Sequence, residues 1–395
     1  MHQAAAELKR LPLPDAAACA HSERLRERLQ QEMVEQGGAI SFARFMELAL
    51  YAPGLGYYSA GSRKFGREGD FVTAPEISPL FSQCLARQIR QVFTMLEGGS
   101  ILEAGAGSGV MAADLLAELE RLGSLPERYL ILEVSADLRE RQRATLAQRV
   151  PGLLGRVAWL ERLPETPFEG VIVANELLDA LPVHRFQVGD SGVQELYVAS
   201  DGKEFRWVTG EPGSDRLAER FEVVAGRLPA GYRSELAVFA EEWVRTMAEV
   251  LRRGLLLFID YGFPRHEYYH PQRSDGTLMC HYRHRAHSDP LILPGLQDIT
   301  AHVEFTAVAE TLVEAGLELY GYTTQAYFLL ANGLEQVLAR EMNEEPLIQL
   351  ELSRQVKLLT LPQEMGELFK VIGAGRGLSG ERLDGFRLRD LRGKL

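Results

Sequence analysis

The protein has 395 residues, of which 46% are hydrophobic and 25% charged, so it can bury a sizeable core. Its formal net charge of −12 argues against nucleic acid as a partner, because phosphate binding requires clustered Lys and Arg. Cys19, Cys84 and Cys280 lack the spacing of a zinc site or disulfide framework, and no apolar run reaches the roughly 18 residues of a membrane span. The N-terminal residues contain no secretory signal, and their acidic residues argue against an organelle transit peptide. We therefore expect a cytoplasmic protein.

The N-terminal part is predicted to be helical and rich in loops. Residues 22–50 predict two helices broken at Gly37 and Gly38, and Ser41 is a suitable N-cap for the second. Residues 51–71 are rich in glycine and aromatic residues without periodicity, which indicates a loop.

From residue 78 onward, predicted helices alternate with short apolar strands. The first helix spans 78–96, with Ser78 as its N-cap and Pro79 at its first position. The predicted strands are 100–109, 128–135, 170–182 and 252–262, and the helices between them include 110–122 and 136–150. Apolar runs alternating with helices are typical of buried parallel strands, so we expect a Rossmann-like, doubly wound α/β fold.

Three segments are expected along the chain. Residues 1–75 would form an N-terminal lid, and residues 76–330 the Rossmann-like core. Alternating residues and Gly-Asp turn signals predict a β-hairpin or meander inserted at about 184–232. Residues 331–395 have a mostly helical pattern and are expected to form a helical C-terminal extension.

The strand "ILEAGAGSG" leads through Gly105, Gly107 and Gly109 into a helix, which is the context of a nucleotide site. The GxGxG spacing is one residue shorter than the dinucleotide pattern GxGxxG, and this argues against NAD or FAD. Glu103 would repel a pyrophosphate but suits a sulfonium or ammonium group, and Glu133 ends the next strand, where an acid can accept both ribose hydroxyls. These features favour S-adenosylmethionine (SAM); the alternative is an ordinary turn with surface acids.

Six blocks carry a resemblance to a known family: "GDFVTAPEIS", "EAGAGSG", "ANELLDALPVHRF", "IDYG", "DGTLMCHYRH" and "PGLQDITAHVEFTAV". On these blocks the chain resembles the MidA/NDUFAF7 family of SAM-dependent methyltransferases. The resemblance implies a Rossmann-like methyltransferase core and, for the eukaryotic members, a role in mitochondrial complex I biogenesis through dimethylation of a protein arginine. It does not identify the substrate of bacterial members.

The "NELLDALP" loop is the predicted catalytic segment. If a helical turn starts there, Glu176 and Asp179 lie on one face and can grip a guanidinium, which stays protonated in water. We interpret Glu176 as the orienting acid, Asp179 as the second acid, and Asn175 as a support for one of them or for the cofactor. Known arginine methyltransferases have a second glutamate further along, where this chain has His184 and Arg185. The alternative is that both acids only cap a helix.

Other candidates come from three segments. In "DITAHVEF", polar and apolar residues alternate, so one face is expected to be buried and the other polar. His302 on the polar face is a candidate proton acceptor or a structural histidine. Asp260 closes a strand and either lines the same cleft or caps that strand. Neighbouring arginines argue against a metal at the clustered histidines, which are His281, His284 and His287.

The segment "GDFVTAPEIS", residues 69–78, is expected to cross the mouth of the cofactor site. Thr73 and Glu76 precede the helix that leads into the first strand. Glu76 is a candidate contact for the methionine ammonium or a cationic substrate; the alternative is a capping role.

The sequence thus predicts a SAM-dependent methyltransferase that acts on a cationic protein side chain, preferably arginine. One alternative is a methyltransferase that modifies a small molecule. Another is a SAM-binding assembly factor of a respiratory-type complex, whose partner contact matters more than turnover. The oligomeric state does not follow from the sequence.

Overall fold

A computed structural model describes residues 11–59, 72–190, 192–226, 228–342, 344–378 and 382–395. The chain divides into two compact units, each formed by several stretches. The meander unit comprises the described residues of Met1–Phe71, Asp179–Ala240 and Arg265–His302. The Rossmann-like unit comprises those of Val72–Leu178, Glu241–Pro264 and Val303–Leu395.

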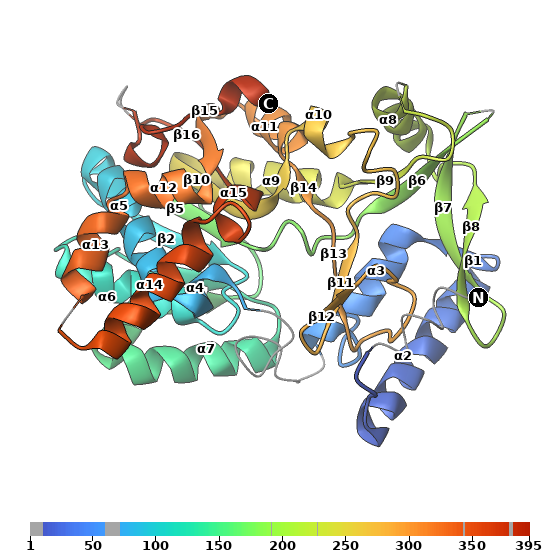
Figure 1. The fold of residues 1–395 in the computed structure, drawn as a ribbon, viewed down its shortest axis with the longest axis horizontal. Coiled ribbons are helices and arrows are strands. Elements are labelled where there is room, and N and C mark those ends of the chain that lie inside the picture. The colour runs from blue at the N-terminus through green and yellow to red at the C-terminus, as the bar shows by residue number, and fades with distance from the viewer. Residues whose placement is uncertain (1–10, 60–71, 191, 227, 343, 379–381) are drawn as a thin grey trace. The chain divides into compact units, whose positions relative to one another are not determined.

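The Rossmann-like unit is built around a sheet that has eight strands within the described residues (Figure 1). The strands are β2 (Ser100–Ala104), β3 (Tyr129–Leu132), β4 (Val157–Leu160), β5 (Phe168–Asn175), β10 (Leu251–Phe263), β14 (Val303–Glu304), β15 (Glu318–Thr324) and β16 (Phe369–Arg376). They follow the order β15-β16-β10-β5-β2-β3-β4, and β14 pairs with β10. The strands from β10 to β4 pair in parallel, whereas β16 pairs antiparallel with both β10 and β15.

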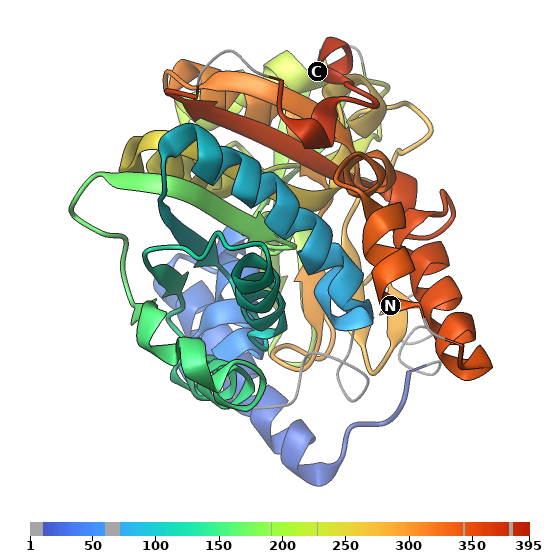
Figure 2. The same cartoon turned by 90° about the vertical axis from the view of Figure 1, so that its left-hand side faces the viewer.

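Helices cover both faces of this sheet. The described helices of this unit are α4 (Ala74–Ile77), α5 (Pro79–Leu96), α6 (Val110–Arg121), α7 (Ala136–Arg149), α11 (Phe305–Glu314), α12 (Gln325–Ala331), α13 (Leu334–Glu341), α14 (Pro346–Thr360) and α15 (Met365–Leu368). Helix α9 (Val238–Val250) begins in the meander unit and continues into this one. Figure 2 shows α5 lying along one face of the sheet. The predicted N-cap is confirmed, because the Ser78 side chain accepts a hydrogen bond from Leu80 N at the start of α5.

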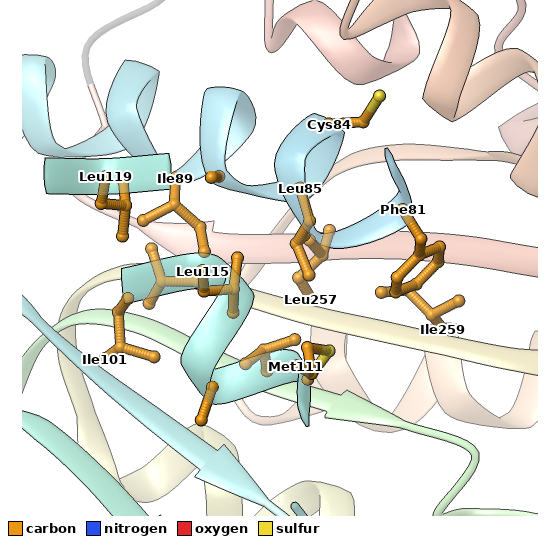
Figure 3. Packing of buried hydrophobic residues seen from close by; sticks show 14 of the residues in the cluster. Phe81, Cys84, Leu85, Ile89, Ile101, Met111, Leu115, Leu119, Leu257 and Ile259 are labelled. Atoms are coloured by element: carbon orange, nitrogen blue, oxygen red, sulfur yellow. The ribbon is translucent and has the colours of Figure 1, made fainter. Parts of the chain in front are cut away.

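The core on the α5 face forms because alternate residues of β10 point to the same side. Leu257 and Ile259 pack in one buried cluster with Phe81 and Leu85 of α5 and Met111 of α6 (Figure 3). Burial of such side chains contributes about 1.5–3 kcal/mol each.

The opposite face of the sheet carries the residues that lie between these core residues along each strand. The Phe258 ring of β10 contacts Trp243 of α9, with ring centroids 5.6 Å apart. Phe305 of α11 contacts Tyr322 of β15 at 5.3 Å. Both faces of the sheet are therefore packed against helices, and the predicted doubly wound fold is confirmed.

Residues 331–395, expected to form a helical C-terminal extension, also contribute strand β16 to the sheet. This strand lies between β10 and β15, and all its residues except Arg376 are buried. A Cβ at Gly375 would lie 2.0 Å from the Gly254 carbonyl oxygen, so glycine permits the close approach of these strands. Because the strand is buried on both faces, it lacks the period-two pattern that would have separated it from the preceding helices.

The meander unit contains a five-stranded antiparallel sheet with the path β1-β7-β6-β9, in which β8 pairs with β7, and a small sheet β12-β11-β13, counted within the described residues. The strands are β1 (Ala39–Ser41), β6 (His184–Gly189), β7 (Gly192–Ser200), β8 (Phe205–Gly210), β9 (Arg233–Leu236), β11 (Met279–Tyr282), β12 (Arg285–His287) and β13 (Asp298–Thr300). The helices are α2 (Ala16–Glu35), α3 (Phe42–Tyr51), α8 (Asp215–Ala225) and α10 (Arg265–Tyr268). Ser41 caps α3 as predicted, by accepting a hydrogen bond from Arg44 N.

The two units divide the chain differently from the three segments expected from the sequence. The inserted β meander belongs with the N-terminal helices, because β1 pairs with β7 and both share a core with α3. Phe45 of α3, for example, meets Phe205 of β8 with ring centroids 5.4 Å apart. Among the described helices, none has the length and apolar composition needed to cross a bilayer.

Candidate functional site

The strand order of the Rossmann-like unit reverses beside β2. From β2 the chain continues outward through β3 to β4, and then returns to β5 on the other side of β2. Ligands in open α/β sheets bind at the carboxyl ends of the strands at such a switch point. The segments that follow β2 and β5 here are the glycine loop and the predicted catalytic loop.

The three glycines of the loop all adopt left-handed backbone conformations. Their φ angles are 71° for Gly105, 52° for Gly107 and 82° for Gly109, which is the N-cap of α6. A Cβ at Gly105 would lie 2.7 Å from Leu177 Cδ1. The left-handed conformation therefore favours glycine at all three positions, and the Leu177 side chain adds a close contact at Gly105, as expected for a backbone that approaches a ligand.

Glu103 lies within β2 and is almost completely buried. Its Oε2 accepts a hydrogen bond of 2.6 Å from the Tyr129 hydroxyl of β3. Burial raises the pKa of Glu103 to about 7, against the lowering effect of that hydrogen bond. A nearby cation would favour the ionised form, so the predicted contact with an ammonium or sulfonium group is chemically reasonable.

Glu133 follows β3 and is also buried. Its Oε1 accepts from Ser135 N at 2.9 Å, and its Oε2 accepts from Gln142 Nε2 at 3.2 Å. Burial raises the pKa of Glu133, whereas these hydrogen bonds lower it. The carboxylate therefore has a defined orientation at the end of the strand where the sequence predicts a ribose contact.

Asn175 and Glu176 stand at the end of β5, next to the glycine loop in the sheet. Glu176 Oε1 accepts from Asn175 Nδ2 at 3.2 Å and from Ala74 N at 3.3 Å. Glu176 has a φ of 51°, which is uncommon for a residue with a side chain. Strained backbone of this kind costs about 1–3 kcal/mol and persists where surrounding contacts impose it.

The predicted helical turn at Glu176 is wrong. Residues 176–183 contain no helix, and the boundary between the two units falls between Leu178 and Asp179. The amide of Glu176 donates to Ile259 O, and the amides of Leu177 and Leu178 donate to Asp260 Oδ2. Since no helical turn forms there, Glu176 and Asp179 do not share a helix face. The expectation that Asp260 closes its strand is wrong, because β10 continues to Phe263; Asp260 instead supports the catalytic loop from within the strand.

Part of the "GDFVTAPEIS" segment, residues 69–71, lies outside the described residues. Thr73 is the N-cap of the short helix α4 but makes no side-chain capping bond. Glu76 lies in this helix and accepts a short hydrogen bond from the Ser108 hydroxyl of the glycine loop. The segment is therefore tied directly to the predicted cofactor loop.

Asp179 contacts the segment that carries His302 through its backbone, within the meander unit. The Asp179 carbonyl accepts from Ala301 N at 2.9 Å, so Asp179 adjoins the segment that carries His302. The His302 amide donates to Thr277 Oγ1, and its Nδ1 lies 3.4 Å from Thr277 O. This contact favours the tautomer with the proton on Nδ1, which places the lone pair on Nε2.

The expected polar face of "DITAHVEF" is not exposed. Asp298, Ile299 and Thr300 are all buried in β13. Asp298 accepts hydrogen bonds from the Tyr58 hydroxyl at 2.9 Å and from Ile299 N. Burial raises the pKa of Tyr58 well above its usual value, and the charge of Asp298 adds to this effect. The polar residues are buried because they bind other parts of the same unit, which local alternation does not reveal.

The described residues contain no group of three or more His, Cys, Asp and Glu side chains arranged to hold a metal ion. Of the clustered histidines, His281 lies in β11, His287 in β12, and His284 in the turn between them with a φ of 60°.

Sequence reasoning missed two polar residues at the glycine loop. Ser108 binds Glu76, and Gln142 of α7 binds both Gly107 O and Glu133. Ser108 lies inside the motif, so its position was a usable signal. Nothing local distinguishes Gln142 from the other polar residues of α7.

The residues at the switch point fit SAM. Asn175 Oδ1 is buried and has no hydrogen-bond partner among the described residues, as expected for an acceptor that faces a bound ammonium or hydroxyl donor. The glycine loop has left-handed backbone at its three glycines, and two buried acids lie beside it, Glu103 within β2 and Glu133 directly after β3.

Comparison with known proteins identifies the cofactor class and the family. Residues 84–323 match a family described as "Putative S-adenosyl-L-methionine-dependent methyltransferase". The chain is 48% identical to a Burkholderia thailandensis protein whose crystal structure contains S-adenosyl-homocysteine. The match covers 98% of this chain and 100% of that chain, with a TM-score of 0.94.

Animal relatives match over most of the chain. The chain is 30% identical to the Drosophila melanogaster protein named protein arginine methyltransferase NDUFAF7 homolog, mitochondrial, over 88% of this chain and 84% of that protein. It is 28% identical to the Homo sapiens protein named protein arginine methyltransferase NDUFAF7, mitochondrial. That match covers 90% of this chain and 83% of the human protein. The expected cytoplasmic location is contradicted by these relatives, since they are named as mitochondrial proteins.

The family match spans more than half of the chain, and the relatives extend it to most of the remainder. The glycine loop, the buried acids Glu103 and Glu133, and the Asn175 oxygen, which has no partner within the described part of the chain, agree with the same cofactor. The chain therefore belongs to the NDUFAF7 family of S-adenosyl-L-methionine-dependent methyltransferases.

Proposed function

We propose that this methyltransferase modifies an arginine side chain of a protein. The relatives from Drosophila melanogaster and Homo sapiens are named protein arginine methyltransferases, which supports this acceptor. The observation that carries the proposal is the position of Glu176, a carboxylate with a left-handed backbone at the end of β5, where the sheet reverses its order.

Glu176 suits a guanidinium. Its Oε1 is held by Ala74 N and Asn175 Nδ2, so the carboxylate is oriented before the acceptor arrives. A guanidinium is a planar fork that a carboxylate binds through two parallel hydrogen bonds, and it stays protonated in water. Glu176 would orient one nitrogen and stabilise the positive charge, and this positioning supplies most of the rate.

Asp179 and His302 are the proposed partners of Glu176 in catalysis. Asp179 would act as a second acid that binds the cationic acceptor. His302, in the tautomer favoured by Thr277, would take up the proton that the acceptor nitrogen releases on methylation.

The remaining predicted residues are proposed to bind SAM, which supplies the methyl group as an electrophilic sulfonium. Glu133 would accept the ribose hydroxyls, and the backbone of Gly105, Gly107 and Gly109 would line the methionine. Glu103, Asn175, Thr73 and Glu76 would surround the ammonium group, where Asn175 Oδ1 provides an acceptor.

The experiment that tests the proposal uses lysate from a strain that lacks this protein. The lysate is incubated with purified protein and tritiated SAM, and the Gly107→Val variant serves as the control because valine is strained at the left-handed φ of 52° found there. We expect label in a protein band and, after hydrolysis, in methylarginine. Label only in small molecules would favour a metabolite as acceptor. Absence of label with intact SAM binding would favour a SAM-binding assembly factor.

A further inference from the structure

Gln142 of α7 is a completely buried residue that joins three parts of the Rossmann-like unit. Its amide contacts the glycine loop, the acid at the end of β3 and the indole of Trp159 in β4. We propose that Gln142 is a positioning residue that sets the Gly107 carbonyl and the Glu133 carboxylate in the geometry that binds the adenosyl cofactor. The inference rests on the proposed role of Glu133 at the ribose.

Trp159 determines which way the Gln142 amide faces. The indole Nε1–H is only a donor, and it lies 2.9 Å from Gln142 Oε1. The amide oxygen must therefore point toward the indole, and the amide nitrogen must point the opposite way. The assignment follows from hydrogen-bond chemistry, since a flipped amide would place two donors against each other.

Both protons of the amide nitrogen then have acceptors in the cofactor loop region. Nε2 donates to Gly107 O at 3.1 Å and to Glu133 Oε2 at 3.2 Å. Ser135 N binds the other oxygen of Glu133, so a separate donor orients each carboxylate oxygen. A carboxylate oxygen has two lone pairs, and each can still accept from a ribose hydroxyl.

The backbone of Gln142 also packs directly on the loop. A Cβ at Gly109 would lie 3.0 Å from Gln142 Cα and 3.3 Å from Gln142 Cβ. The same residue therefore limits the loop sterically and binds its carbonyl. A buried amide with every group satisfied rigidifies its surroundings, and here those surroundings are the loop and Glu133.

The test compares Gln142→Met with Gln88→Met as a matched control. Gln88 of α5 is also completely buried, and its amide binds Gln91 and Gly385 N, remote from the glycine loop in these contacts. Affinity for S-adenosyl-homocysteine is measured by calorimetry, and stability by urea unfolding. We expect Gln142→Met to weaken binding by about tenfold or more, because a hydrogen bond to a charged group and one to the loop are lost. Gln88→Met should lose stability but keep its affinity.

Gln142→Glu provides a readout that a structural role would not change. Its carboxylate still accepts from Trp159, but in the ionised form it repels Glu133. Affinity for S-adenosyl-homocysteine should therefore fall more steeply with rising pH than in the native protein, because the protonated form can still donate to Glu133. Trp159→Phe removes the indole N–H that orients the Gln142 amide, so it should also weaken binding of S-adenosyl-homocysteine. This variant tests the inference if the Gln142 variants do not fold.

A native affinity in Gln142→Met, with a stability loss like that of Gln88→Met, would overturn the inference. Equal affinity of the native protein for S-adenosyl-homocysteine and its 2′-deoxy analogue would overturn the role of Glu133 on which it rests. Neither measurement involves a methyl acceptor. The proposed arginine methylation is therefore tested independently, by transfer of tritium from SAM to protein.

Discussion

The carboxylate of Asp260 accepts a hydrogen bond of 2.9 Å from the backbone amide of Leu178, which lies two residues after Glu176. The same oxygen accepts from Leu177 N, while Oδ1 accepts from Tyr261 N. A completely buried side chain in β10 therefore determines the path of the chain after the neighbouring strand β5. The position of the proposed catalytic acid depends on this contact.

Asp260→Asn should reduce turnover without a comparable loss of cofactor binding. An asparagine must turn its NH₂ group toward at least one backbone amide that now donates to Asp260, which costs about 1–3 kcal/mol. The resulting shift of Glu176 should lower kcat by about tenfold to a hundredfold, because small misplacements of orienting groups are costly. The measurements are kcat and the Kd for S-adenosyl-homocysteine. Asp201→Asn is the control, since exposed Asp201 also accepts from two backbone amides. Equal losses in both variants would contradict the role of Asp260.

Glu76→Ala should weaken cofactor binding more than Ser108→Ala. Each change removes the hydrogen bond between α4 and the glycine loop, but only the change at Glu76 also removes a negative charge. If Glu76 meets the methionine ammonium, the difference should be about three- to tenfold in Kd. Calorimetry with S-adenosyl-homocysteine measures it. If both variants lose the same affinity, Glu76 acts only by binding Ser108 and does not contact the cofactor. If both keep the native affinity, the contact between Glu76 and Ser108 has only a structural role.

Glu103 should make stability depend on pH. Its pKa is raised to about 7 in the folded protein from 4.5, so the folded state holds the proton more tightly than the unfolded state. The contribution to stability is therefore present below pH 4.5 and is lost as the pH rises to about 7. Glu103→Gln removes this ionisation while its amide oxygen still accepts from Tyr129. Relative to the native protein, the variant should gain up to about 3 kcal/mol between pH 5 and pH 8.

Urea unfolding of the cofactor-free protein at several pH values measures this gain, and exposed Glu120 on α6 offers Glu120→Gln as the control. A constant difference between the Glu103→Gln variant and the native protein across this range would show that burial does not perturb Glu103.

Features with a local cause could be predicted from the sequence. Ser41 and Ser78 cap their helices because a short hydroxyl side chain before a helix satisfies a free backbone amide. The glycine loop was recognised because left-handed conformations and close packing both select glycine. The doubly wound sheet followed from alternation of apolar strands with helices.

Features with a tertiary cause could not be predicted. The helical turn considered after β5 is absent, and the amides of this loop bind Ile259 O and Asp260, which lie on another strand. Strand β16 lies in the middle of a sheet and has no exposed face to produce a period of two. Gln142 acts through the glycine loop after β2, the acid after β3 and Trp159 of β4, and its own helix shows no sign of this.

The most direct test of the central claim is Glu176→Gln, assayed for methyl transfer from tritiated SAM to protein and for binding of S-adenosyl-homocysteine. Glutamine keeps the size of the side chain but cannot balance a guanidinium charge, so transfer to methylarginine should fall by about a hundredfold or more. Affinity for S-adenosyl-homocysteine should stay within about threefold of the native value, since the amide oxygen can still accept from Ala74 N. Retention of near-native transfer by this variant would contradict the proposal that Glu176 orients an arginine for methylation.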